Sequence, residues 1–233
     1  MTEALTPQAW QAIWLTLKLA LITSLLLMVV ATPLAWVLSN WQHKTKPFVL
    51  SILALPLVLP PTVLGFYLLV AFSPQSTLGG AWVSITGHPL AFSFEGLVLG
   101  SLIYSLPFAL QPLYSGFTQL DRRYLEVAQT LGLTSFQRFF KVVLPLCKAP
   151  AIVAFGLSFA HTVGEFGVVL MIGGNIPGET QVLSIALYEQ VEALQYQDAH
   201  ALSLCLLIFS FLLLTGLYRF SGKGALGWNL ASR

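Results

Sequence analysis

The feature that most constrains this sequence is a set of five apolar runs, each long enough to cross a membrane as a helix. The runs cover residues 13–38, 48–72, 94–117, 151–172 and 199–218. A helix needs about 20 apolar residues to cross a hydrocarbon layer about 30 Å thick. Only 9% of the 233 residues are charged, whereas soluble domains carry about 25%. We therefore predict an all-α membrane protein with one transmembrane domain over residues 1–233.

A sixth apolar segment, residues 182–194, is shorter and contains Glu189 and Glu192. We expect a surface or re-entrant helix there, and a sixth span is the alternative. Prolines interrupt the long runs at Pro33, Pro56, Pro60, Pro61, Pro107 and Pro112. A proline frees backbone groups that lipid cannot satisfy, so neighbouring helices or a cavity must satisfy them.

The basic residues predict how the chain is oriented in the membrane. Apart from Lys18, the 11 Lys and Arg residues fall in three segments. They are Lys44 and Lys46, then Arg122, Arg123, Arg138, Lys141 and Lys148, and finally Arg219, Lys223 and Arg233. The intervening segments 73–93 and 173–198 contain no Lys or Arg. Because basic residues accumulate on the cytoplasmic side, we predict the N-terminus outside and the C-terminus in the cytoplasm.

The long loop between the third and fourth runs, residues 119–148, is amphipathic. Asp121 is a candidate N-cap for a first helix, and Gly132 suits a left-handed position at its C-terminal end. Thr134–Gln137 has the spacing of a capping box for a second helix, which we expect to end before Pro145. The loop is therefore predicted to be two short helices at the inner membrane face.

Seven residues of this loop resemble the EAA motif of ABC importer permeases. They are Glu126, Val127, Ala128, Gly132, Val142, Leu144 and Pro145. The spacing matches throughout, and Val127 departs from the Ala that is most common in the family. The resemblance implies the type I ABC importer permease fold. It also implies that the other six residues form a coupling element, because in that family the loop docks in a groove on a separate ATPase subunit.

Further along the chain, several stretches resemble the molybdate branch of these permeases. They are His161–Gly167, Gly173–Gly178, Thr180–Val182, Ser184 and Val191–Ala193. Sulfate permeases are similar around Gly164–Gly167 and Gly174–Ile176 but differ in the residues that follow. The resemblance thus favours molybdate over sulfate and does not separate molybdate from tungstate.

The resemblance also implies an assembly in the bacterial inner (plasma) membrane. Its expected members are two copies of this chain, two ABC ATPase subunits and an extracytoplasmic oxyanion-binding protein, with no nucleic acid. The sequence has no GxxxxGK[ST] phosphate loop, and Gly222–Gly227 lacks the required order. We expect ATP and Mg to bind on the partner ATPase. In this chain we expect no bound cofactor, no metal at Cys147 or Cys205, and no catalytic residue.

An oxyanion path requires N–H donors more than fixed cations, which would hold the anion too firmly. Thr62, beside a proline-broken turn, and Gly174 and Asn175, in a glycine-rich segment, are the candidate donors. A plain turn between helices is the alternative for the glycine-rich segment.

His161 and Glu165 are the ionisable residues that fall clearly inside a run, and their spacing predicts one shared helix face. We expect Glu165 to shape a gate by bonding to His161 or to backbone freed at a helix break. A packing pair without a transport role is the alternative. A proton-coupled secondary transporter and an intramembrane enzyme are the rival functions for the same two residues.

Overall fold

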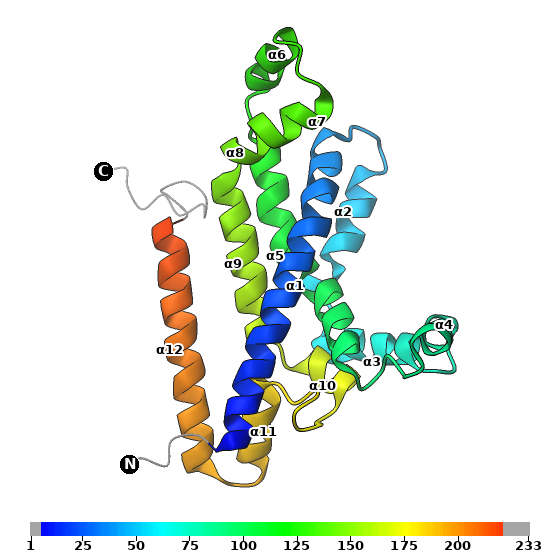
Figure 1. Ribbon diagram of the computed structural model, residues 1–233, viewed down its shortest axis with the longest axis vertical. Coiled ribbons are helices and arrows are strands. Elements are labelled where there is room, and N and C mark those ends of the chain that lie inside the picture. Colours follow the sequence, from blue (N-terminus) through cyan, green and yellow to red (C-terminus); the bar gives the residue numbers. More distant parts are fainter. Residues whose placement is uncertain (1–5, 221–233) are drawn as a thin grey trace.

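The structure, a computed structural model, describes residues 6–220, and every regular element in that range is a helix (Figure 1). Three of the helices are long and apolar enough to cross a membrane. They are α1 (Pro7–Asn40), α5 (Phe94–Thr118) and α12 (Tyr196–Phe220). These helices confirm the first, third and fifth predicted spans. The residues Lys223 and Arg233 and the segment Gly222–Gly227 lie outside the described range.

The second predicted span, residues 48–72, is wrong as one continuous helix. The chain forms α2 (Lys46–Ala54), the short 3-10 helix η1 (Leu55–Leu57) and α3 (Pro61–Phe72), with a bend of 103° at the break. Pro60 explains the break, because it takes an extended conformation with ψ at 134° immediately before the proline that begins α3. The apolar run is therefore a broken span or a re-entrant loop.

The fourth predicted span, residues 151–172, is also divided. Helix α9 (Lys148–Val163) ends at Gly164, and α10 (Gly167–Gly173) begins after a short break. Before α9 the chain turns by 74° from the helical segment Ser135–Leu146. If each bent pair counts as one span, the described residues contain up to five spans.

Helix α11 (Leu183–Glu192) has only 10 residues, about 15 Å of helix, which is half the thickness of the hydrocarbon layer. The sixth-span alternative for residues 182–194 is therefore wrong. Helix α11 packs on α12 and on α1 at the end of the molecule opposite α6 (Figure 1). Its short length agrees with the predicted surface or re-entrant helix.

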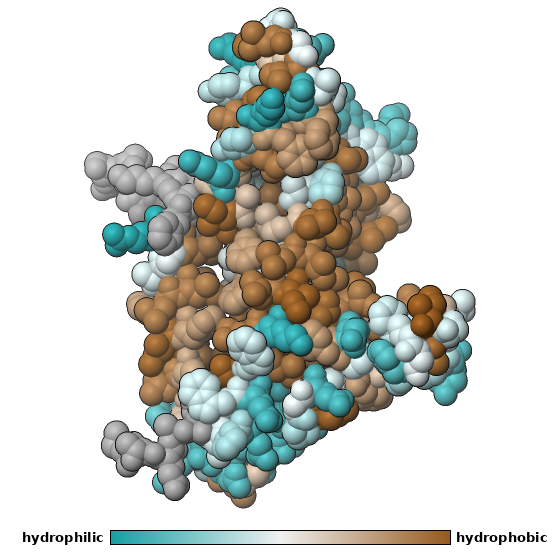
Figure 2. All heavy atoms as spheres, viewed as in Figure 1, coloured by the Kyte–Doolittle hydropathy of each residue, from teal (hydrophilic) through white to brown (hydrophobic). Residues whose placement is uncertain are grey.

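Helices α1, α5 and α9 pack together as the central bundle, and α12 lies against α9 (Figure 1). Small side chains line the contact, with Ala31 and Ala35 of α1 and Ala109 of α5 all fully buried in one apolar cluster. Small residues allow helix backbones to approach closely in lipid, where little hydrophobic force brings helices together. Hydrophobic side chains cover the middle of the molecule, and polar ones gather toward its two ends (Figure 2).

Two segments leave the bundle. Helix α4 (Thr77–Thr86) projects sideways beyond α3 (Figure 1). The loop predicted from the sequence, residues 119–148, projects from the end of the bundle opposite α11. It contains α6 (Arg122–Thr130), α7 (Ser135–Arg138), the π-helical turn η2 (Phe139–Val143) and α8 (Leu144–Leu146). We call the segment from α6 to α8 the coupling loop.

Candidate functional site

Helix α6 is amphipathic and exposes its apolar face. Its N-terminus is capped as predicted, since the Asp121 carboxylate accepts a hydrogen bond of 2.9 Å from the backbone N–H of Arg123. Ala128 points inward and is 3% exposed. The large apolar residues Tyr124, Val127 and Leu131 are exposed. An exposed apolar surface with a polar rim marks an interaction site.

The C-terminal end of α6 confirms the prediction for Gly132, which has φ at +78°. Its N–H donates to the carbonyl of Gln129 at 3.0 Å, and the N–H of Leu133 donates to the carbonyl of Ala128 at 3.1 Å. These two bonds form a Schellman motif, whose left-handed position favours glycine. Apart from the two neighbouring residues in the chain, no atom of the described residues lies within 4 Å of the position of a Cβ on Gly132. Backbone conformation, not lack of space, therefore selects glycine here.

The second helix of the coupling loop begins with the predicted capping box. The Thr134 hydroxyl accepts from the N–H of Gln137 at 3.3 Å, and the Gln137 amide oxygen accepts from the N–H of Thr134 at 3.0 Å. The expectation that this helix ends before Pro145 is wrong. A π-helical turn follows, in which Leu144 donates to the carbonyl of Phe139, and helix α8 then includes Pro145. The wider turn shifts the hydrogen-bond register, which accommodates a residue that has no N–H.

The six candidate coupling residues thus lie on two helical segments, α6 and the segment from α7 to α8, and on the turn at Gly132 that joins them. Glu126 is exposed on α6, close to the buried Ala128 and the cap at Gly132. Val142 and Leu144 are half-buried, and Pro145 is exposed. The motif spacing therefore corresponds to one compact element, α6 to α8, at one end of the bundle.

The prediction that His161 and Glu165 share a helix face is wrong, because α9 ends at Val163. Glu165 lies in the break after α9, is 3% exposed, and accepts a 2.8 Å hydrogen bond from the hydroxyl of Ser101. His161 is joined instead to Ser105, with 2.8 Å between its Nδ1 and the hydroxyl. The two ionisable side chains therefore bond to serines one helical turn apart on α5.

The break around Glu165 is held from two sides. The hydroxyl of Ser184 on α11 donates to the backbone carbonyl of Glu165, while Ser101 on α5 bonds to its side chain. The second carboxyl oxygen, Oε1, is buried without a hydrogen-bond partner among the described residues. Glu165 lies at a helix break as predicted, but the expected bond from its carboxylate to His161 or to freed backbone is wrong, because Ser101 is the partner instead. No sequence pattern pointed to Ser184 as a partner. For Ser101 and Ser105, their four-residue spacing in an apolar run was the available signal.

The remaining path candidates lie at the two ends of α10. Thr62, at the start of α3, is near the first residue of α10, since a Cβ on Gly167 would lie 3.6 Å from its backbone nitrogen. Gly174 has φ at +62° and follows the other end of α10, and Asn175 beside it is exposed. The Thr180 hydroxyl accepts from the N–H of Ile176, so one donor of the glycine-rich turn is already used within the turn.

The sequence matches the family described as "Binding-protein-dependent transport system inner membrane component" over residues 31–222. It is 50% identical over 207 residues to the molybdenum transport system permease protein ModB of Azotobacter vinelandii, covering 89% of this chain and 92% of that protein. It is 31% identical over 208 residues to the sulfate transport system permease protein CysT of Escherichia coli (strain K12), and this match covers 89% of this chain and 75% of that protein.

The fold resembles a crystal structure of a bacterial ABC transporter involved in the import of the acidic polysaccharide alginate. The TM-score is 0.74 at 17% sequence identity, and the match covers 93% of this chain and 80% of that one. At such low identity the comparison concerns the fold alone, and it confirms the all-helical permease architecture. With the family match extending over most of the sequence, the chain belongs to the family of inner membrane components of binding-protein-dependent transport systems.

Proposed function

We propose that this chain is the permease subunit of an ATP-driven importer and forms the transmembrane path for molybdate. The coupling loop is the observation that carries the proposal. It projects past the bundle with an apolar helix face exposed and with both ends of that helix capped (Figure 1). A rigid amphipathic helix of this kind suits a groove on a partner protein. The 50% identity to a molybdenum transport permease supports the substrate.

The proposed assembly contains two copies of this chain, two ABC ATPase subunits and an extracytoplasmic oxyanion-binding protein. The family description, which names a binding protein, supports the last of these. ATP and Mg²⁺ bind on the ATPase, and this chain is not catalytic. The proposed coupling residues are the six motif positions between Glu126 and Pro145, which connect the docked helix α6 with the start of α9.

ATP-dependent uptake tests this function. Vesicles that contain the chain with its ATPase partner and binding protein should accumulate molybdate only when ATP is present. Vanadate should stop this accumulation. Sulfate at equal concentration should compete poorly. Uptake driven by a pH gradient without ATP would support the secondary transporter, and a preference for sulfate would support the sulfate permease alternative.

We place the coupling loop in the cytoplasm and the segment between α3 and α4 outside, on the basis of the Lys and Arg distribution. Single cysteines at Thr130 and Gln75, both exposed, test this in a chain with Cys147 and Cys205 replaced by alanine. We expect an impermeant maleimide to label Gln75→Cys in intact cells and to reach Thr130→Cys only after permeabilisation. The reverse pattern would show that the orientation is inverted.

The proposed path passes the break between α9 and α10, with Thr62, His161, Glu165, Gly174 and Asn175 as its candidate residues. The close approach of two interrupted helices supports this location, because Gly167 at the start of α10 meets Pro61 at the start of α3. Helix breaks at membrane depth are tolerated where they are buried in protein or line a cavity.

We expect Glu165→Gln to keep most of the uptake, since the glutamine amide oxygen can still accept the hydrogen bond from Ser101. Glu165→Ala should lose more, because it leaves the buried Ser101 hydroxyl without this acceptor, at a cost of about 1–3 kcal/mol. Initial uptake rates, with the exposed Glu95→Gln as the charge-matched control, measure both effects. Equal loss in Glu165→Gln and Glu165→Ala would show that the charge itself is needed.

A further inference from the structure

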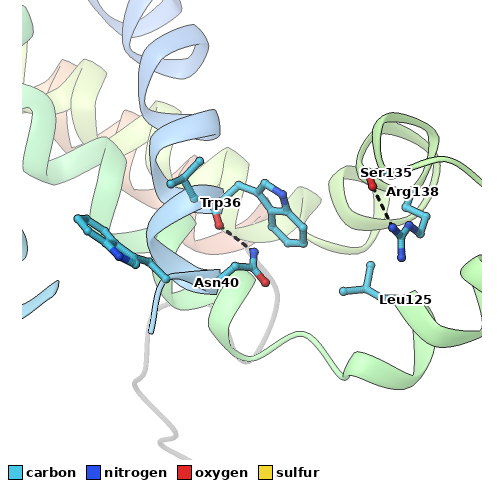
Figure 3. Close-up of a pocket in the computed structure, with 7 residues that line it drawn as sticks. Trp36, Asn40, Leu125, Ser135 and Arg138 are labelled. Carbon is cyan, nitrogen blue, oxygen red and sulfur yellow. Dashed lines mark hydrogen bonds between the residues drawn. The ribbon is translucent and has the colours of Figure 1, made fainter. Parts of the chain in front are cut away.

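Two adjoining hollows lie between the end of α1 and the coupling loop, with volumes of about 650 Å³ and 330 Å³. Trp36, Asn40 and Leu125 bound both of them. Trp36 and Asn40 come from α1, whereas Leu125 faces them from α6 (Figure 3). We call this pair of hollows the interface groove. The larger hollow falls within the range of about 300–1,000 Å³ that is usual for small-molecule sites.

The interface groove lies where a membrane span ends. Trp36 and Trp41 are in the last turn of α1 and just beyond it, and Lys44 and Lys46 follow within a few residues. Tryptophan is enriched where hydrocarbon gives way to headgroups. A molecule in the groove would therefore lie at the depth of a lipid headgroup and the first part of its acyl chains.

One wall of the larger hollow is apolar and reaches the exposed surface of α1. Its members are Trp36, Val37, Trp41 and Leu125. Val37 is 59% exposed, so this wall continues onto the outer surface of α1. The Trp36 ring is supported from behind by Phe117 and Phe139, at centroid distances of 5.6 Å and 5.5 Å. The wall is thus a fixed surface suited to a flexible hydrocarbon chain.

The opposite wall carries a cation. Arg138 of α7 donates to the hydroxyl of Ser135 at 3.0 Å (Figure 3). It also donates to the side-chain oxygen of Gln129 at 2.9 Å, and both acceptors are neutral. No carboxylate lies within ion-pair distance of Arg138 among residues 6–220. Guanidinium has five N–H donors, so donors remain for a phosphate. The smaller hollow is lined by Arg122 and also by Glu126, so the larger hollow is the better place for an anion.

We propose that the interface groove binds one anionic phospholipid, with its headgroup phosphate at Arg138 and an acyl chain along Trp36 and Val37. An inorganic oxyanion would leave the apolar wall uncovered, and a neutral lipid would leave the Arg138 charge unmatched. The inference rests on the proposed orientation, since the cytoplasmic leaflet carries the anionic lipids that basic pockets on this side bind. Such a lipid joins the coupling loop to the end of α1.

Quenching of Trp36 fluorescence tests the lipid directly. The chain has 6 tryptophans, and a variant that keeps only Trp36 reports on the groove when it is assembled with the ATPase in phosphatidylcholine nanodiscs. We expect brominated phosphatidylglycerol to reach half-quenching at a mole fraction about fivefold lower than brominated phosphatidylcholine, as one basic contact predicts. Arg138→Gln should remove this difference, whereas Arg219→Gln, at the end of α12, should preserve it.

Each contrary result identifies a different error. Equal quenching by the two brominated lipids, or an equal effect of Arg138→Gln and Arg219→Gln, overturns the lipid site. Relief of quenching by inorganic phosphate shows an anion site that needs no lipid. Quenching by both lipids only when the ATPase is left out shows that a protein segment, and not a lipid, fills the groove in the assembled transporter. A folding defect in Arg138→Gln is recognised by its elution volume. Ser135→Asp then serves as the second variant: it places a carboxylate beside Arg138, within the larger hollow, and should likewise remove the difference between the two lipids. ATP-dependent uptake is measured separately, so failure of the lipid site is distinct from failure of the transport function.

Discussion

Gly132→Val is expected to leave the chain inserted in the membrane while it separates ATP hydrolysis from transport. Gly132 has φ at +78°, and an L-residue with a Cβ adopts this region at a cost of about 1–2 kcal/mol. Valine, branched at Cβ, is among the least tolerant side chains there. The two Schellman bonds that close α6 depend on this conformation. Their loss would redirect the chain between α6 and α7 and misplace the docking face.

The matched control is Gly132→Asn, because asparagine tolerates the left-handed region better than other residues with a Cβ. Within residues 6–220, only the chain neighbours of Gly132 come close to its Cβ position, so a difference between valine and asparagine reflects backbone conformation and not a clash. We expect Gly132→Val to lower the ATPase activity stimulated by the loaded binding protein by about tenfold, the factor equivalent to 1.4 kcal/mol. Gly132→Asn should stay near the parent value.

Copurification of the ATPase subunit and the stimulated rate of ATP hydrolysis are the measurements. Gly132→Val should lower the copurified amount of ATPase, the stimulated rate of hydrolysis, or both, while the amount of permease in the membrane stays unchanged. Normal assembly and normal stimulated turnover in Gly132→Val would remove the main support for the coupling role of this loop.

The sequence predicted the local features of this loop because their causes are local. The cap at Asp121, the left-handed Gly132 and the capping box at Thr134 each depend on residues no more than five positions apart. The π-helical turn before Pro145 was not predicted. It is an alternative way of accommodating a proline inside a helical path, and the loop's residue pattern does not distinguish it from a helix end.

The breaks inside two apolar runs show where the sequence is insufficient. Hydropathy predicts that a segment lies in the membrane, but it does not say whether the segment is straight. The prolines predicted the position of the break before α3. They did not predict its bend of 103°, which occurs together with the packing of α3 on α10. The break at Glu165 depends on Ser101, which is 64 residues away. The periodicity of apolar residues along a helix does not predict contacts between residues so far apart in the sequence.

The junction of the two broken helices gives the second large expected effect, at Gly167. A Cβ on this residue would lie 2.8 Å from the Cβ of Pro61, whereas carbon atoms pack at about 3.5–4.0 Å. The proline ring is rigid, so α10 must move away from α3. We expect Gly167→Ala to cost about 1–3 kcal/mol through overpacking, and Gly167→Leu to cost more.

Gly164→Ala is the matched control, because the nearest atoms to its Cβ would be carbonyl oxygens at 3.7 Å and 3.8 Å, an ordinary contact. Both variants add one methyl group at the same helix break, but only one of them meets the start of α3. The midpoint temperature of thermal unfolding, measured on the detergent-purified complex, should fall clearly for Gly167→Ala and little for Gly164→Ala. Molybdate uptake should fall more steeply than stability if the junction lines the path, since a displaced α10 also moves the break at Glu165. Equal stability and equal uptake in the two variants would mean that the contact between α3 and α10 is not maintained in the working transporter.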